Sequence, residues 1–404
     1  MIECTTRSGP TSVSEFDADA DFGTFTAAVS LHAHTHHSRE SFADVTGYLS
    51  QVPLVGHRFV HELHSCLVED RGGADYSGVW WHPPVSPRMV FESESSQIEQ
   101  RLGLAALVSV TDHDDIAAGL ELQSLYAERR APVSFEWTVP FAGGFFHLGL
   151  HNLPPASAVS WFLRLSAVTA EPTRDAIADA LADLDAIDDL LIVFNHPHWD
   201  LAEVGQASHV QSVRQFLDCF GGWLHALELN GYRSWQENES VRPVAAALGL
   251  PVISGGDRHA KEPNAILNLT RARSFSEFVV EIRNGVSHVL IMPEYRRHLT
   301  TRILSSASDI LRLNAACPPG RQRWTDRVSW DTDGARRTLT SRWPHGGPLS
   351  VRAAVGALTM LTSPIILPVI RVALGWHEGV LARSAPMVID EPQPPESVDA
   401  SRAA

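Results

Sequence analysis

Short apolar runs recur along the chain, and most end in polar side chains that can bind a metal ion. The run at 25–31 is rich in residues that favour strands, and His32 and His34 follow it directly. Because side chains of an extended chain alternate, these two imidazoles would lie on one side of the strand end. A lone His-x-His pair is a weak signal, so the other strand ends decide what it means.

Later apolar runs repeat this arrangement. The predicted strand at 132–137 contains Glu136, and a carboxylate in an apolar strand is costly unless it is paired or bound to a metal. The remaining runs and their polar ends are 104–110 with Asp112 and His113, 190–194 with His196 and His198, 224–230 with Arg233, and 251–255 with Asp257 and His259. If these strands are parallel, their polar ends share one rim.

Two positions near these ends have alternative interpretations. His147 and His151 follow a Gly143-Gly144 turn, and we favour His147 as a ligand, with His151 as a structural alternative. Asp114 or Asp115 can cap the helix expected near Ile116, which would leave Asp112 and His113 available for chemistry. The helical spacing at 97–102 and across 156–190 separates the strands, so the order predicts a β/α barrel with its site at one rim.

The flanking regions differ in composition from this core. Residues 1–22 are polar and acidic and predict a disordered leader. The stretch at about 45–95 predicts a loop-rich insertion, in which His61 and His64 fit a surface helix better than a ligand pair.

Residues 296–385 predict a C-terminal extension that is partly helical, and 386–404 a disordered tail. The apolar segment 353–370 lies between Arg352 and Arg371 and is at the lower length limit for a membrane span. Pro364 and Pro368 interrupt it, so a buried or oligomer-forming helical hairpin is favoured, with weak membrane association as the alternative.

Composition narrows the class of protein. Hydrophobic residues make up 44% of the 404 residues and charged residues 20%, as in globular proteins. The net charge of -15 argues against a broad nucleic-acid surface, which needs many cations to neutralise phosphates. The four cysteines show no paired spacing, and the N-terminus lacks the features of a secretory signal, so we expect a cytoplasmic protein without a disulfide framework.

Five motifs in order resemble those of the PHP (polymerase and histidinol phosphatase) superfamily across about residues 25–290. They are His32-Ala33-His34, Thr111-Asp112-His113-Asp114, Glu136 with His147, Asn195-His196-Pro197 and Gly256-Asp257-Arg258-His259. The resemblance implies an α/β fold over 23–295, a distorted (β/α)7 TIM-like barrel carrying the insertion and the C-terminal helical extension. It also implies two or three divalent metals and hydrolysis of a phosphate ester by a metal-activated water.

Carried over by position, the resemblance assigns ligands to three metals. The first would be held by His32, His34, Glu136 and Asp257, the second by Glu136, His147 and His196, and the third by His113 and His259. Where the family usually has a further ligand for the third metal, this chain has Arg39. We expect Glu40 to take that place, with His37 as the alternative.

The nitrogen and oxygen donors suit Zn, Mn or Fe. Arg233 and Arg258 could each bind phosphate oxygens or form ordinary ion pairs, and His198 could protonate a leaving group. Asp257 would serve catalysis as a ligand. The expected partner is a small phosphorylated substrate, either a phosphomonoester or a nucleotide. The alternatives are a metallohydrolase of the amidohydrolase type, which normally has a lysine at a strand end, and a non-catalytic, metal-stabilised regulatory or interaction module.

Overall fold

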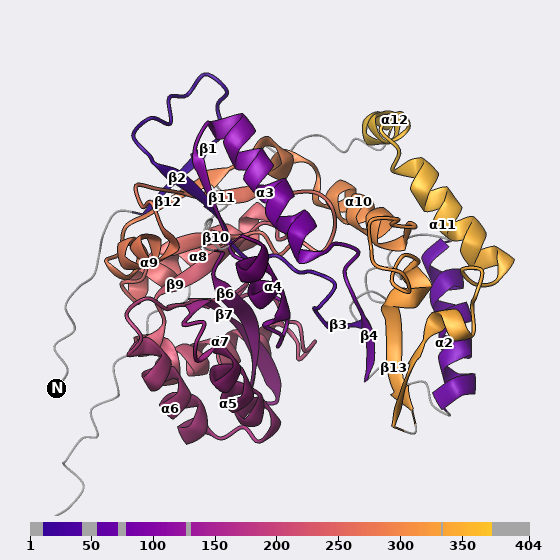
Figure 1. Ribbon diagram of the computed structural model, residues 1–404, viewed down its shortest axis with the longest axis horizontal. Coiled ribbons are helices and arrows are strands. Elements are labelled where there is room, and N and C mark those ends of the chain that lie inside the picture. The colour runs from indigo at the N-terminus through magenta and orange to yellow at the C-terminus, as the bar shows by residue number, and fades with distance from the viewer. Residues whose placement is uncertain (1–10, 43–54, 72–77, 127–130, 333, 374–404) are drawn as a thin grey trace, which may run out of the picture.

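Two five-stranded sheets form the centre of the fold in the computed structural model, which describes residues 11–42, 55–71, 78–126, 131–332 and 334–373 (Figure 1). The first sheet has the order β1-β12-β11-β2-β5 and the second β10-β9-β8-β7-β6. The first comprises β1 (Thr11–Glu15), β2 (Ala27–Ser30), β5 (Ala105–Val108), β11 (Ile266–Thr270) and β12 (Ser287–Ile291). The second comprises β6 (Val133–Phe141), β7 (Gly144–Leu153), β8 (Leu191–Phe194), β9 (Ala226–Asn230) and β10 (Val252–Gly255).

Helices connect and cover these strands. They are α2 (Val55–Arg71), α3 (Pro87–Leu102), α4 (Ala117–Leu125), α5 (Ala158–Ala170), α6 (Arg174–Asp185), α7 (Gln206–Phe220), α8 (Trp235–Ala247), α9 (Phe275–Arg283), α10 (Leu299–Leu311), α11 (Leu349–Leu361) and α12 (Leu367–Ala373). Short 3₁₀ turns lie at η2 (Gly221–Trp223), η3 (Pro293–Arg296), η4 (Trp324–Arg327) and η5 (Leu339–Ser341). Thus the predicted strands and intervening helices are present in the expected order.

Local sequence explains several helix boundaries. Ser86, Thr173, Ser234 and Ser274 precede α3, α6, α8 and α9, and each side-chain oxygen accepts a hydrogen bond from the backbone N–H three residues later. Such caps satisfy donors that the first helical turn leaves without partners. Gly103 ends α3 with a φ of 66°, a conformation that costs glycine little.

The α/β class is confirmed, but the predicted (β/α)7 TIM-like barrel is not, because the ladders of the described residues form two open sheets of mixed direction. The physical reason lies at the strand ends. His32, His196 and Asp257 have positive φ values of 60°, 26° and 52°, so the chain leaves the extended conformation there and the ladders stop. Isolated bridges, Ala33 with Arg258 and His113 with Glu136, join the two sheets beyond these ends.

A third sheet unites the insertion with the C-terminal extension. Its order is β14-β13-β4-β3, and every pair is antiparallel. The strands β3 (Glu40–Ser41) and β4 (Val79–Trp81) come from the insertion side, whereas β13 (Val328–Thr332) and β14 (Ala335–Thr338) come from the extension. The two segments are therefore one structural unit, although more than 200 residues separate them.

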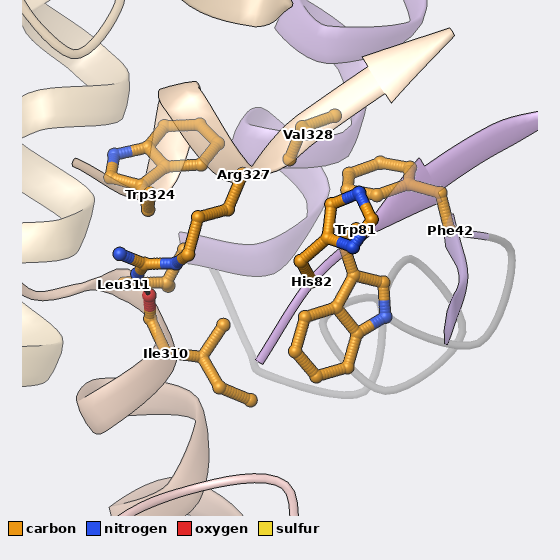
Figure 2. A pocket seen from close by; sticks show the side chains of 8 residues that line it. All are labelled: Phe42, Trp81, His82, Ile310, Leu311, Trp324, Arg327 and Val328. Carbon is orange, nitrogen blue, oxygen red and sulfur yellow. Dashed lines mark hydrogen bonds between the residues drawn. The ribbon is translucent and has the colours of Figure 1, made fainter. Parts of the chain in front are cut away.

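This unit has its own hydrophobic core, which we call the second core. It buries Phe42, Leu63, Leu67 and Trp81 against residues of the extension: Leu311, Trp324, Val328, Trp330, Leu339 and Val351. Figure 2 shows a narrow cavity in it, lined from one side by Phe42 and Trp81 and from the other by Ile310, Leu311 and Trp324. Burial of these aromatic rings explains why a tryptophan-rich stretch without clear periodicity is ordered.

Several predictions for the flanking regions need correction. Residues 11–15 of the predicted disordered leader form β1, because they pair in parallel with β12. The insertion is not loop-rich where it is described, since it contains α2, β4 and the start of α3, and His61 and His64 lie on helix α2 as expected. The predicted tail at 386–404 lies outside the described residues. The division into domains otherwise stays a prediction.

The apolar segment 353–370 forms most of α11 and the start of α12, with a break around Pro364. Val351 and Leu358 of α11 are buried in the second core, whereas Ile365, Val369 and Val372 are exposed. None of the helices in the described ranges is both long and apolar enough to cross a bilayer. Oligomerisation and weak membrane association through this segment stay predictions.

We predict that Trp330→Ala lowers the free energy of unfolding by about 3–5 kcal/mol, because it removes a fully buried ring from the second core. Leu349→Ala, at a side chain that is 79% exposed, is the control and should cost about 0.5 kcal/mol or less. Denaturant titrations of both variants measure the difference. Equal small losses would show that the second core does not stabilise the protein.

Candidate metal centre

The nine side chains predicted as metal ligands form one cluster where the two large sheets meet. Each lies on or just after a different part of the sheets: His32 and His34 after β2, Glu40 in β3, His113 after β5, Glu136 in β6, His147 in β7, His196 after β8, and Asp257 and His259 after β10. Contacts within 4 Å link all nine into a single network. Because the strand ends meet at this edge, residues 32 and 259 become neighbours.

Glu136 is fully buried at the centre of this network. Its Oε1 lies 3.3 Å from His147 Nδ1 and 3.2 Å from His196 Nε2. Its Oε2 lies 3.0 Å from His32 Nε2, 3.4 Å from His34 Nε2 and 3.2 Å from His113 Nδ1. The two oxygens thus face different groups of imidazoles, the arrangement needed by a carboxylate that bridges two ions.

Asp257 completes the group around the opening His-x-His pair. Its Oδ1 lies 3.6 Å from His32 Nε2 and 3.4 Å from His34 Nε2. The amide of Asn230 donates to the other oxygen, Oδ2, at 3.1 Å. This leaves Oδ1 directed at the two imidazoles, so His32, His34, Glu136 and Asp257 converge as the resemblance implied.

The third group gathers around Glu40. Its Oε2 lies 3.2 Å from His113 Nε2 and 3.1 Å from His259 Nε2, and its Oε1 lies 3.5 Å from His34 Nδ1. The alternative ligand, His37, instead places Nε2 3.3 Å from Glu121 of α4. The structure therefore puts Glu40, and not His37, beside His113 and His259.

Buried atoms without hydrogen-bond partners show that these residues fit a metal. His34 Nε2, His147 Nδ1 and Glu40 Oε1 are buried and form no hydrogen bond in the described part of the chain, although oppositely charged or polar atoms lie 3.3–3.5 Å away. Ligand atoms bound at about 2.1 Å to one ion lie about 3–3.4 Å apart. An all-nitrogen and oxygen donor set with this spacing suits divalent ions.

The electrostatics of the cluster are those of a site built for cations. Burial alone would raise the pKa of Glu136, but His32, His113 and His147 outweigh it and hold the pKa well below its usual range. Burial would lower the pKa of His113, yet Glu40 and Glu136 raise it to about 10. Burial and neighbouring His259 lower the pKa of His34 to about 3. Protons on some imidazoles thus compensate the carboxylates, and bound metals would take over that role.

Residues outside the predicted set orient the ligands. Glu228 in β9 places Oε1 2.5 Å from His32 Nδ1, and its Oε2 accepts a hydrogen bond from the backbone N–H of His196 at 2.8 Å. The amide of Asn195 donates to Glu136 Oε1 at 2.9 Å. A Cβ at position 255 would overlap the Glu228 carboxylate, so Gly255 allows this close approach. The sequence signal for Glu228 was the same as for Glu136, a carboxylate inside an apolar strand.

Of the two alternatives for Arg258, the structure shows an ion pair. Its guanidinium is buried in an ion pair with Glu94 of α3 and also donates to the carbonyl oxygens of Ala260 and Lys261. These partners occupy its donors and hold the loop after β10 against α3. Arg258 therefore joins the loop after β10 to α3 beside the cluster, and a role in phosphate binding stays a prediction.

Arg233 and His198 lie near the cluster without a described contact to its ligands. Arg233 donates to Glu237 at 2.8 Å and stacks 4.4 Å from the ring centroid of Trp199, which in turn packs edge-on against His196. His198 Nδ1 lies 2.6 Å from Ser240 Oγ, and burial lowers the pKa of His198. Their roles in phosphate binding and proton transfer stay predictions.

The structure also shows the surroundings of His151, Asp115 and Asp112, for which the sequence left alternatives. His151 Nδ1 lies 2.8 Å from Ser109 Oγ, and burial lowers the pKa of His151 to about 3, as expected for a structural histidine. Asp115 Oδ1 accepts from the Ala117 N–H at the start of α4. Asp112 is not available for chemistry, because it accepts from both the N–H and the hydroxyl of Thr35 and so fixes the opening motif.

No protein-family model matches the chain, and no curated protein matches it. Solved structures to which it is similar include a candidate metal-dependent phosphoesterase from Bifidobacterium adolescentis, with 19% identity, a TM-score of 0.31, and 50% of this chain and 92% of that chain covered. Another is a two-domain protein from Bacteroides vulgatus containing a predicted PHP-like metal-dependent phosphoesterase, with 12% identity, a TM-score of 0.37, and 69% and 67% covered.

Both of these structures are described as containing a metal-dependent phosphoesterase, and the second as PHP-like. The chain is also similar to an amidohydrolase from Chromobacterium violaceum, with 16% identity, a TM-score of 0.33, and 50% and 92% covered. Identities and TM-scores this low do not indicate an activity for this chain.

We predict that Arg258→Met lowers the free energy of unfolding by about 3–5 kcal/mol, because it leaves the buried Glu94 carboxylate without its cation. The control is Arg101→Met, which breaks the partly exposed pair with Glu294 and should cost about 1 kcal/mol or less. Denaturant titration compares the two variants. A loss for Arg258→Met no larger than that of the control would contradict the structural role of Arg258.

Proposed function

We propose that this protein hydrolyses a phosphate ester with the help of two or three divalent ions, zinc, manganese or iron. The observation that carries this proposal is the convergence of six histidines and three carboxylates on a rim where the two oxygens of Glu136 face separate groups of imidazoles. A buried cluster of this size is costly as a purely structural feature, because every charge in it must be compensated.

Three overlapping groups would hold the ions. As carried over from the resemblance, the first is His32, His34, Glu136 and Asp257, the second is Glu136, His147 and His196, and the third is Glu40, His113 and His259, with His34 also 3.5 Å from Glu40. When bound, such ions activate water and neutralise charge on a phosphoryl group. The expected substrate is a small phosphomonoester or a nucleotide.

The chain's own residues prepare the site for this chemistry. Glu228 holds the ring of His32, and Asn230 and Asn195 hold the carboxylates of Asp257 and Glu136, so the ligands are oriented before any ion binds. The ligands on the sheets are buried, whereas His113 and His259 are partly exposed, which leaves the side of the third group open to solvent. We infer that substrate enters from that side.

We also infer that the rim completes a distorted seven-stranded ring around the site. Backbone hydrogen bonds from Gly256 to Leu31 and from Asp257 to His32 support this on one side, and those from Glu136 to Asp112 and from Asp114 to Glu136 support it on the other. These four bonds are 2.7–3.1 Å long. They would keep the ligand-bearing strand ends at fixed distances.

The amidohydrolase alternative is weaker because the bridging position is a glutamate. The only lysine in the sequence is Lys261, an exposed residue in the loop after β10, whereas that class normally uses a lysine at a strand end. A non-catalytic, metal-stabilised module remains the contrasting hypothesis, and turnover separates it from a hydrolase.

We expect purified protein to contain two or three equivalents of Zn, Mn or Fe and to hydrolyse members of a panel of phosphate esters. Asp257→Asn should lose at least one equivalent and reduce kcat/KM by about 100-fold or more, since even residues behind metal ligands contribute 10–100-fold. Elemental analysis, phosphate release and circular dichroism are the measurements. A folded Asp257→Asn variant with full metal and turnover would refute the assignment, and metal without turnover would favour the non-catalytic module.

Glu40→Gln and His37→Gln distinguish the two candidates for the third metal. We predict that Glu40→Gln loses one metal equivalent, because an amide cannot replace the carboxylate between His113 and His259. His37→Gln should keep the full content, since His37 faces Glu121. Elemental analysis of both proteins after identical metal loading decides the question, and the opposite pattern would show that His37 is the ligand.

A further inference from the structure

The C-terminal extension is the basic part of an acidic protein. Residues 296–373 contain twelve arginines, four aspartates and no glutamate or lysine, whereas the whole chain has a net charge of -15. Such an asymmetry within one chain indicates that the basic part meets an anion. One of these arginines contacts the segment that carries the opening metal motif.

The extension borders the centre through the third sheet. Glu40 lies on β3, the edge strand of the sheet that β4, β13 and β14 complete. Trp81 of β4 packs 5.8 Å, ring to ring, from His259, and His82 Nδ1 donates to the carbonyl of Ser38 at 2.6 Å. In Figure 1 the sheet strands β3, β4 and β13 lie between the central sheets and helix α2.

Arg321 of the extension reaches the opening metal motif itself. One of its guanidinium nitrogens donates to the carbonyl oxygen of His36 at 2.6 Å, two residues after the ligand His34. The side chain is half-buried, and among the described residues no carboxylate lies within 4 Å of it. A partly buried cation without a close anion is energetically unfavourable, so the position suits a negatively charged ligand.

A buried imidazole nitrogen without a hydrogen-bond partner among the described residues lies beside the carbonyl group that Arg321 contacts. Burial lowers the pKa of Arg321, and the positive charge of Arg336 on β14 lowers it further. His36 Nδ1 is buried without a hydrogen-bond partner in the described part of the chain. The acidic groups that raise the pKa of Arg321 are the Cys317 thiol and Asp115, whose Oδ1 accepts a hydrogen bond from the Ala117 N–H.

The backbone of Arg321 is held in place from inside the extension. Arg327, which is buried, donates to the carbonyl oxygens of Arg321 and Gln322 at 3.0 and 3.1 Å and to those of Ile310 and Arg312. Asn314 anchors the same loop to the carbonyl of Pro84. A side chain presented by a fixed loop loses little freedom on binding, as expected of a recognition residue.

We propose that Arg321 binds a negatively charged group of the substrate that lies outside the metal ligands. The inference rests on the proposed function, because it assumes that the phosphoryl group occupies the metal centre. It specifies the substrate class as a phosphate ester that carries a second anionic group, a carboxylate or a second phosphate. Arg321 thus fills the role that the sequence offered as one alternative for Arg258, whose guanidinium is paired with Glu94.

A matched pair of phosphonates tests this without requiring turnover. Methylphosphonate and phosphonoacetate share the phosphoryl-like head and an unreactive carbon–phosphorus bond, and only the second has a carboxylate. Isothermal titration of manganese-loaded protein should show phosphonoacetate binding about 10-fold more tightly or better, the gain expected of a charged hydrogen bond. In Arg321→Gln the preference should fall to about 2-fold or less.

Two further variants keep the test decisive. Arg352→Gln removes an exposed positive charge from α11 of the same extension and should retain the wild-type preference. Arg321→Lys keeps the positive charge but not the planar fork, and should retain part of the preference even if Arg321→Gln folds poorly. Metal content is measured for each variant, because loss of binding must occur with the metals retained.

The outcomes separate the two proposals. Absence of a preference in the wild-type protein, or an equal preference in Arg321→Gln, would overturn the anion site. Loss of the preference in Arg321→Gln at unchanged metal content supports it. If phosphate esters are not hydrolysed but the preference depends on Arg321, the proposed hydrolysis fails while the anion site stands.

Discussion

The burial of the Glu136 carboxylate is the constraint on which the rest of the structure depends. A fully buried charge costs several kcal/mol unless it is compensated, and here five imidazoles and one amide surround it. These partners come from strand ends far apart in the sequence, so compensation is achieved only when both sheets are in place. The left-handed backbone at His32, His196 and Asp257 is part of the same requirement, because it turns these side chains away from the ladders and toward Glu136.

The insertion and the C-terminal extension share one sheet and one hydrophobic core. Neither contributes more than two strands to the third sheet, and two strands alone are marginally stable in water. Together they bury the tryptophans of the second core and position Glu40 at the sheet edge next to His113 and His259. The part of the chain that seems remote from the central sheets therefore determines one side of the centre, including the cationic position of Arg321.

The central part of the chain is acidic, whereas the extension is basic. Most carboxylates of the ligand cluster lie on the central sheets, and twelve arginines lie in the extension. Under the proposed function, the carboxylates would hold cations, and the phosphoryl oxygens of the substrate would be neutralised by them. Any further anionic group of the substrate would need a separate cation. Arg327 shows how the extension supports Arg321, because its buried guanidinium donates to the backbone carbonyls of Arg321 and Gln322 as well as to those of Ile310 and Arg312.

The sequence by itself determined the strand ends and the ligand types they carry, because the alternation of side chains and the apolar runs are local properties. All nine predicted ligands lie in the cluster for that reason. Only the tertiary structure showed that Glu40, and not His37, lies beside His113 and His259. Both residues belong to the same short motif, and Glu40 is placed by the pairing of β3 with β4. The tertiary structure also decided the ion pair of Arg258, whose partner Glu94 is 164 residues away, and revealed Arg321. Such partners depend on which distant segments pack together, which no local pattern specifies.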